Sequence, residues 1–246
     1  SILPPAAVPP AVYLCWLSPP VDRCAMSTML GTGVYGYREA ARLTGLKQER
    51  IREWFRSRPA GSKRGPVFRR DYQPVDGARA ISFFDLIDVF VAGQLREHGV
   101  ALQTLRRAYS RLADELHTSH PFCRRELLSD GKNVFTRGMD EKGREELKEV
   151  LTHQKVFPQI ILPFIKRIDY GDVSKLAERW HIDRLVVIDP RICFGTPIVE
   201  AVSIPTAILS AAYEANNQDA ELVAGWYNVH ADHVLAAVEF ERKMAA

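Results

Sequence analysis

The side chains between residues 47 and 70 that have a functional pattern are mostly cations, spaced so that they could bind phosphates together. The set comprises Lys47, Gln48, Arg50, Arg52, Arg56, Lys63, Arg64, Arg69 and Arg70. DNA presents a dense line of phosphates, and cations gathered on one face bind it by releasing condensed counterions. Residues 27–80 hold 12 Lys and Arg against 5 Asp and Glu, whereas residues 184–246 hold 4 against 8. The net charge of +3 therefore conceals a basic front, which we predict to bind DNA, and an acidic tail.

A second group that could do chemistry is the segment containing His117, His120 and Cys123, which are possible metal ligands. A structural zinc site needs four ligands, usually as close pairs from two segments, and no second Cys/His pair lies near. Nothing in the sequence selects a fourth ligand from the remaining candidates, which are His153, His181, His230 and His233. We therefore interpret the segment as a polar loop after a helix, and predict no metal and no cofactor.

No motif in the chain indicates an enzyme. Residues 31–36 match the pattern GxGxxG. Dinucleotide binding also requires a strand before this pattern and a βαβ unit around it, and the sequence indicates neither. Nucleophile elbow, HExxH and phosphate-loop motifs do not occur. Four scattered cysteines without a CxxC pair favour a reducing cytoplasm, and the lack of about 18 consecutive apolar residues predicts no membrane span. We predict a cytoplasmic protein that is not an enzyme.

Two short helices must position the basic side chains. Apolar residues recur at helical spacing from Tyr37, and Gly45 ends that run. A second helix begins at Lys47, has Ile51, Trp54 and Phe55 on one face, and ends before Pro59. This spacing is typical of a helix-turn-helix whose second helix projects its polar side chains outward. Residues 67–68 and 80–81 are predicted to form two strands of a basic hairpin, or wing.

The remaining elements are predicted to be mostly helical. Ser82 and Asp85 form a capping-box pattern at the start of a helix that Gly99 ends. A hairpin is predicted at Asp130–Gly131, and a strand at 185–188 leads into a short hairpin. Further helices are expected at 102–116, 140–152, 156–168 (one kinked helix or two short ones), 174–180, 206–215, 219–227 and 231–244.

These elements predict a mainly α chain. The expected parts are a Pro-rich extension at 1–25, a winged helix-turn-helix domain at 26–118, an α-rich middle region with a small hairpin at 119–183, and a homeodomain-like three-helix unit at 184–246. Residues 1–25 contain six prolines, which favour polyproline II over regular structure, and we interpret them as an extension or a misplaced start. A docking arm that uses Tyr13, Leu14 and Trp16 is the alternative.

The front of the chain resembles a known family. The run of residues 37–46, the stretch 50–54, the helix from Ser82 and the stretch 95–107 resemble the MerR-type winged helix-turn-helix proteins. The resemblance covers residues 35–116 and implies that Arg52 contacts the DNA backbone. It also implies a symmetric dimer that reads two half-sites. Where that family has paired aromatics this chain has Glu53–Trp54, so no role carries over to Glu53.

The tail resembles a second family. Residues 188–199, 221–227 and 234–240 are similar to the domain of unknown function 433, which is associated with VapB-like antitoxins. Ala201-Val202-Ser203 stands where that family usually has Gly-Thr-Arg. The two resemblances together imply a VapB-type antitoxin that binds a PIN-domain ribonuclease toxin and represses its own operon. Because the last helix carries more acidic than basic residues, we expect the tail to contact protein and not bases.

A second function from another class fits the same pattern. The chain could be a stand-alone MerR-like transcription regulator that senses a small ligand through residues 120–183. A neighbouring reading frame for a PIN-domain protein favours the antitoxin, and release of the operator by a metabolite favours the regulator.

Overall fold

Helices and two antiparallel sheets alternate along the protein. The computed structural model describes residues 32–56, 66–74, 79–127 and 162–245. The elements of the first half are β1 (Tyr35–Gly36), α2 (Tyr37–Thr44), α3 (Gln48–Trp54), β2 (Ala80–Ile81), α4 (Phe83–Glu97), α5 (Leu102–Glu115) and the 3-10 helix η2 (Pro121–Cys123). Those of the second half are α8 (Leu162–Ile165), β3 (Ile168–Tyr170), β4 (Ala177–His181), β5 (Val186–Ile188), η4 (Cys193–Gly195), β6 (Ile198–Val199), β7 (Ile204–Pro205), α9 (Thr206–Ala215), α10 (Ala220–Tyr227) and α11 (Ala231–Ala245).

The turn between α2 and α3 follows from its glycine. Gly45 takes the left-handed conformation, with φ +72°, and ends α2. Leu46 follows in the core, and its side chain packs so closely on α4 that a Cβ at Gly93 would lie 2.6 Å from it. Ile51 and Trp54 of α3 are also buried. The apolar residues of the pair thus hold both helices on α4 and leave the polar face of α3 outward.

Helix α4 is the centre of the first half. Ser82 caps it by accepting a hydrogen bond from the Asp85 backbone N–H, while the Asp85 carboxylate accepts one from the Ser82 N–H, which confirms the predicted capping box. Ten residues of α4 are buried, so it packs against neighbours on most sides. No helix within the described ranges has the length and apolar content needed to cross a membrane.

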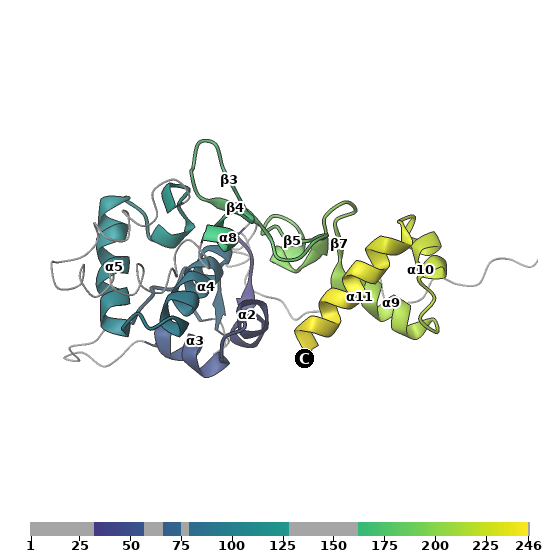
Figure 1. Ribbon diagram of the computed structural model, residues 1–246, viewed down its shortest axis with the longest axis horizontal. Helices are drawn as coiled ribbons and strands as arrows, with labels where there is room; N and C mark the ends of the chain where they lie inside the picture. Colours follow the sequence, from purple (N-terminus) through teal and green to yellow (C-terminus); the bar gives the residue numbers. More distant parts are fainter. Residues whose placement is uncertain (1–31, 57–65, 75–78, 128–161, 246) are drawn as a thin grey trace, which may run out of the picture.

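The second half contains a sheet with the strand order β3-β4-β5-β6-β7, in which every pair is antiparallel. Trp180 of β4 lies opposite Ile188 of β5, and Val187 of β5 lies opposite Ile198 of β6. Strand β3 has a bulge between Asp169 and Tyr170 where it meets β4. In Figure 1 this sheet lies between the helices α2–α5 and the helices α9–α11.

The predicted fold class was wrong, because the chain is mixed α/β and not mainly α. The largest difference falls on residues 174–180, which were expected to be helical but include strand β4. Their apolar spacing fits a helix, yet pairing with β3 and β5 on both sides determines the conformation. The region 156–168 is described only from residue 162, and there a four-residue helix leads directly into β3. The hairpin at 130–131 and the helix at 140–152 lie outside the described residues.

The predicted wing also differs from the structure. Strand β2 does not pair with residues 67–68 but with β1, which precedes the helix-turn-helix. The backbone N–H groups of Val67 and Phe68 instead donate to the Trp54 carbonyl at the end of α3, at 2.8 and 3.3 Å. Both side chains are buried in the core. Burial against α3 therefore replaces the hairpin ladder for this segment.

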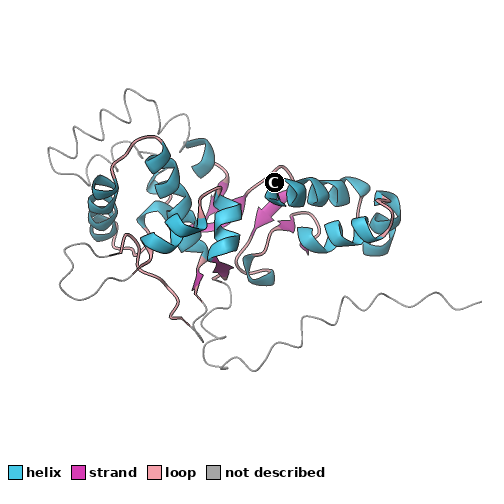
Figure 2. Ribbon diagram, turned by 90° about the horizontal axis from the view of Figure 1, so that it is seen from below, coloured by secondary structure: helices cyan, strands magenta, loops and turns pink. Residues whose placement is uncertain are grey.

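Helices α9, α10 and α11 are joined to the sheet and do not form a separate three-helix unit. Helix α9 follows β7 directly, and α11 contacts β5, β6 and also α2 of the first half. Arg42 of α2 donates from Nε to the Met244 carbonyl at 2.9 Å and lies 3.8 Å from the Glu241 carboxylate. Figure 2 shows the strands lying between the two groups of helices.

Residues 34–35 of the first half form hydrogen bonds with the turn 193–195 of the second half. The buried Tyr35 hydroxyl donates to the Gly195 carbonyl at 2.9 Å, and the Val34 N–H donates to the Phe194 carbonyl at 2.9 Å. Cys193, Phe194 and Gly195 all have positive φ, which folds this turn tightly against residues 33–35. A Cβ on Gly195 would lie 2.1 Å from the Tyr35 hydroxyl.

Gly195→Ala should lower the free energy of unfolding by roughly 2–4 kcal/mol, because it adds a left-handed alanine and a clash at a buried hydrogen bond. Chemical denaturation measures this effect. Gly225→Ala is the matched control, since Gly225 lies in α10 with open space around it and alanine favours a helix. Equal stability of both variants would show that the Tyr35 contact does not hold the halves together.

Candidate nucleic-acid interface

The polar face of α3 is exposed, and it carries most of the predicted contact residues. Lys47, Arg50, Arg52 and Arg56 are exposed and Gln48 is half-buried. Burial of Ile51 and Trp54 on the opposite side of the helix determines this orientation. A short helix with its cations outward is the arrangement that a major groove accepts.

A groove of about 750 Å³ runs between α3 and the segment that leads to β2. Its lining consists of Glu49, Arg52, Glu53, Arg56, Arg70, Gln73, Pro74 and Arg79. We call it the arginine groove. It brings together three predicted residues, Arg52, Arg56 and Arg70. Arg79 also lines this groove but was not predicted. Its position just before a short strand gave no sign in the sequence that it would join this surface.

Arg70 is held in place by the end of α3. Its Nη2 donates to the Phe55 carbonyl at 2.8 Å. Just before it, Phe68 packs edge-on against Trp54, with ring centroids 5.8 Å apart, and against Phe55 at 5.6 Å. A cation at a helix C-terminus also interacts favourably with the helix dipole. The segment and α3 therefore present their arginines from one packed unit.

Two carboxylates reduce the positive charge of this groove. Glu53 lies 3.6 Å from the Arg56 guanidinium, and Glu49 also lines the groove. Because the Arg56 and Glu53 side chains are both well exposed, the ion pair between them is weak.

The other predicted residues lie elsewhere. Arg50 points toward α4, where it lies 3.7 Å from the Glu97 carboxylate. Arg69 faces a different groove from its neighbour Arg70. Lys63 and Arg64 lie outside the described residues.

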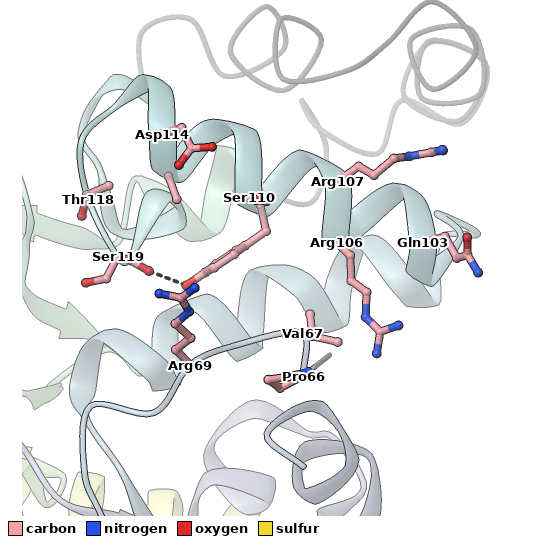
Figure 3. Close-up of a pocket in the computed structure, with 12 residues that line it drawn as sticks. Pro66, Val67, Arg69, Gln103, Arg106, Arg107, Ser110, Asp114, Thr118 and Ser119 are labelled. Atoms are coloured by element: carbon pink, nitrogen blue, oxygen red, sulfur yellow. Dashed lines mark hydrogen bonds between the residues drawn. The ribbon is translucent and has the colours of Figure 1, made fainter. Parts of the chain in front are cut away.

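The groove that Arg69 faces has a volume of about 880 Å³ and lies between the segment 66–69, α5 and residues 118–119. Figure 3 shows the Arg69 side chain extending toward Ser119, and the Arg106 side chain extending from α5 on the side of Pro66 and Val67. Arg107 and Gln103 belong to the same lining. Its walls carry three arginines and the Asp114 carboxylate around an apolar patch that includes Val67 and Ala113. Such a groove suits a small anionic molecule better than a base edge.

A buried cluster of charged side chains lies next to this groove. The His120 ring donates from Nδ1 to the Asp88 carboxylate at 2.8 Å and from Nε2 to the Asp71 carboxylate at 3.0 Å. The Tyr109 hydroxyl donates to Asp88 at 2.7 Å, and the Phe122 N–H donates to the other Asp88 oxygen at 3.2 Å. Asp85 completes the cluster through its contacts with Ser82 and Asp71. The cluster fixes the 66–74 segment to α4 and to the loop after α5.

The pKa values of the cluster reflect its burial and its charges. Burial alone lowers the pKa of His120, but its hydrogen bonds to Asp71 and Asp88 outweigh that effect and raise the pKa to about 10. Burial raises the pKa of Asp85 to about 7, and the charge of Asp71 adds to the rise. Burial also raises the pKa of Asp88, against the effect of its hydrogen bond to His120. Around neutral pH, His120 is an imidazolium between carboxylates.

The three residues considered as metal ligands in the sequence do not come together. His117 is exposed, whereas His120 and Cys123 are buried. Cys123 donates through Sγ to the Phe84 carbonyl at 3.3 Å, and it packs under α4. The groups that do gather around His120 are carboxylates from distant segments, which the spacing of His and Cys residues could not reveal.

Comparisons with known proteins show the fold alone. The chain matches no protein-family profile and no curated protein sequence. It is similar in structure to Rv2018 from Mycobacterium tuberculosis, with a TM-score of 0.62 and 20% sequence identity over 83% of this chain and 96% of that chain. The mixed arrangement of helices and sheets described above is therefore shared with a solved structure.

Proposed function

We propose that this protein is a DNA-binding antitoxin of the VapBC type, which represses its own operon and neutralises a PIN-domain ribonuclease by direct binding. The observation that carries the DNA-binding part of the proposal is the arginine groove, where Arg52, Arg56 and Arg70 gather beside the exposed face of a short helix in a helix-turn-helix. Such a surface binds the phosphates of DNA whatever the base sequence, and contacts from α3 to the bases add sequence selectivity.

In this proposal α3 enters the major groove, and the arginine groove follows one phosphate backbone. Lys47 and Gln48 at the start of α3 then lie nearest the base edges, because the first residues of a recognition helix reach deepest. Arg52, Arg56 and Arg70 contact phosphates and set the register. A homodimer would place two such surfaces on two half-sites.

Glu53→Gln should strengthen binding to operator DNA by about two- to fivefold, because it removes a carboxylate from a surface that approaches phosphates. Fluorescence anisotropy with a labelled operator fragment measures the change. Glu178→Gln is the control, since Glu178 is an exposed carboxylate of β4 and removal of its charge should leave the affinity unchanged. Weaker binding of Glu53→Gln would contradict the placement of α3 against DNA.

The second half is proposed to bind the toxin. Its helices α9 and α10 leave large apolar side chains exposed, namely Ile208, Leu222 and Trp226, of which Trp226 is 52% exposed. Exposed aromatic and aliphatic side chains of this kind are typical of protein contacts. Co-expression of the tagged chain with the neighbouring reading frame, followed by affinity capture, tests this part. Capture of a PIN-domain ribonuclease supports it, and recovery of the chain alone refutes it.

A second candidate function is a stand-alone regulator that releases DNA when it binds a small anionic ligand. The groove of about 880 Å³ around Arg69 and Arg106 favours it, although that groove lies outside residues 120–183, where a sensor was expected. Operator release by a metabolite, in a chain without a toxin partner, would support this function over the antitoxin.

A further inference from the structure

The cluster around His120 contains more negative than positive groups. Three carboxylates, from Asp71, Asp85 and Asp88, surround one imidazole. Asp85 and Asp88 are 0% exposed and His120 is 5% exposed. Burying several carboxylates beside one imidazole is costly unless protons or a bound cation offset their charge.

Three of these groups bring possible metal-ligand atoms close together. One ring nitrogen of His120, one carboxylate oxygen of Asp71 and one of Asp85 all lie within 4.8 Å of one another. Metal bonds of about 2.0–2.2 Å place the ligand atoms of one ion roughly 3.3 Å apart, so a closure of at most about 1.5 Å would suffice. These residues come from the 66–74 segment, α4 and the loop after α5.

Asp85 contributes an oxygen that has no other role among the described residues. Its Oδ2 accepts hydrogen bonds from the backbone N–H groups of Ser82 and Asp71, at 3.1 and 3.4 Å. Its Oδ1 is buried and accepts no hydrogen bond from any group in the described ranges. A buried carboxylate oxygen without a partner requires an explanation, and a bound cation supplies one.

Asp88 holds the imidazole as the outer carboxylate of a metal site does. It binds Nδ1 of His120 at 2.8 Å and therefore directs Nε2 toward Asp71. Carboxylate–histidine–metal arrangements of this kind fix both the tautomer and the ring orientation. The Asp71 side chain is 32% exposed, so an ion can reach the cluster from solvent.

We propose that Asp71, Asp85 and His120 bind a divalent transition-metal ion such as Zn²⁺, with Asp88 as the outer carboxylate that orients the imidazole. The ion takes the place of the proton between His120 and Asp71. The imidazole nitrogen and carboxylate oxygens of this site are ligands that Zn²⁺ accepts, and none of the three ligands is a thiolate. The ion links the segment that carries Arg69 and Arg70 to α4, and the inference does not depend on DNA binding.

Calorimetric titration of the tag-free, chelator-treated full chain with Zn²⁺ tests this proposal. The wild-type chain should bind one Zn²⁺, and the Asp85→Asn variant should bind it about 100-fold more weakly. Loss of an outer partner lowers metal affinity by roughly 10–100-fold, and loss of a direct ligand costs more. Asn keeps an oxygen for the Ser82 cap, so this variant should still fold. His120→Gln should lose the site as well. His117→Gln, which alters an exposed histidine three residues away, should bind Zn²⁺ like the wild type.

X-ray absorption of the Zn²⁺-loaded wild-type chain gives a second, independent measurement. One imidazole and otherwise oxygen neighbours are expected. Sulfur neighbours, wild-type affinity in Asp85→Asn, or no binding of Zn²⁺ by the wild-type chain would each overturn the proposal and leave His120 as an ion-paired residue only.

Discussion

Replacement of both Arg52 and Arg56 with alanine is expected to weaken operator binding by tenfold or more, which corresponds to about 1.4 kcal/mol. Both side chains line the arginine groove, and each is expected to neutralise one phosphate. Loss of a phosphate contact weakens binding to all sequences and lowers the salt slope by about one per arginine. Fluorescence anisotropy on specific and random DNA fragments at two salt concentrations measures both effects.

A double variant with the same loss of charge serves as the control. Lys166 and Arg184 are exposed cations of the second half, so Lys166→Ala with Arg184→Ala should leave operator binding unchanged. Arg52→Ala with Arg56→Ala should also retain capture of the toxin. Equal loss of DNA binding in both double variants would mean that overall charge, and not the face of α3, determines binding. Loss of both DNA and toxin binding in the α3 variant would contradict the division of roles between the two halves.

Asp88→Asn is expected to lower the free energy of unfolding by about 3 kcal/mol in buffer that contains a chelator. Asp88 is fully buried and accepts hydrogen bonds from Tyr109, His120 and the Phe122 backbone. Asn keeps one acceptor oxygen, but its NH2 group replaces the other and would face a donor, either the Phe122 N–H or the Tyr109 and His120 groups, that it cannot accept from. Breaking a buried, hydrogen-bonded charge pair by altering one partner typically costs 3–5 kcal/mol.

Urea denaturation monitored by tryptophan fluorescence measures the change, and Trp54 and Trp180 are both buried reporters. Asp172→Asn is the control, because the Asp172 side chain is fully exposed and such a substitution should change stability by less than about 0.5 kcal/mol. A loss below 1 kcal/mol for Asp88→Asn would show that the cluster contributes little to the fold.

The helices of the first half could be predicted from the sequence because their signals are local. Gly45 ends α2, and Ser82 with Asp85 begins α4, as their spacing indicates. Each signal depends on residues within one turn, so no knowledge of the tertiary structure is needed. The same holds for the three helices at the C-terminal end, whose bounds differ from the prediction by one residue at most.

The strands could not be predicted in the same way, because distant partners determine them. Strand β1 is two residues long and pairs with β2 more than 40 residues later. Strand β4 has an apolar spacing that a helix would also satisfy, and its neighbours decide between the two. The error in fold class follows directly from these short, non-local pairs.

The candidate site was predictable in its composition but not in its geometry. Charge counting found the cations, yet only the structure separates Arg50 and Arg69 from the arginine groove and adds Arg79 to it. The pairing of His120 with Asp71 spans 49 residues of sequence. No spacing rule connects residues so far apart.

Salt dependence of operator binding tests the central claim most directly. The affinity of the full chain for a fragment of its own promoter is measured from 50 to 200 mM KCl, a range over which phosphate contacts are strongly screened. With about four phosphate contacts for each protomer and a dimer on the operator, the logarithm of the affinity should fall with the logarithm of salt at a slope near −7. A slope near zero would contradict the assignment of the exposed face of α3 as a DNA-binding surface.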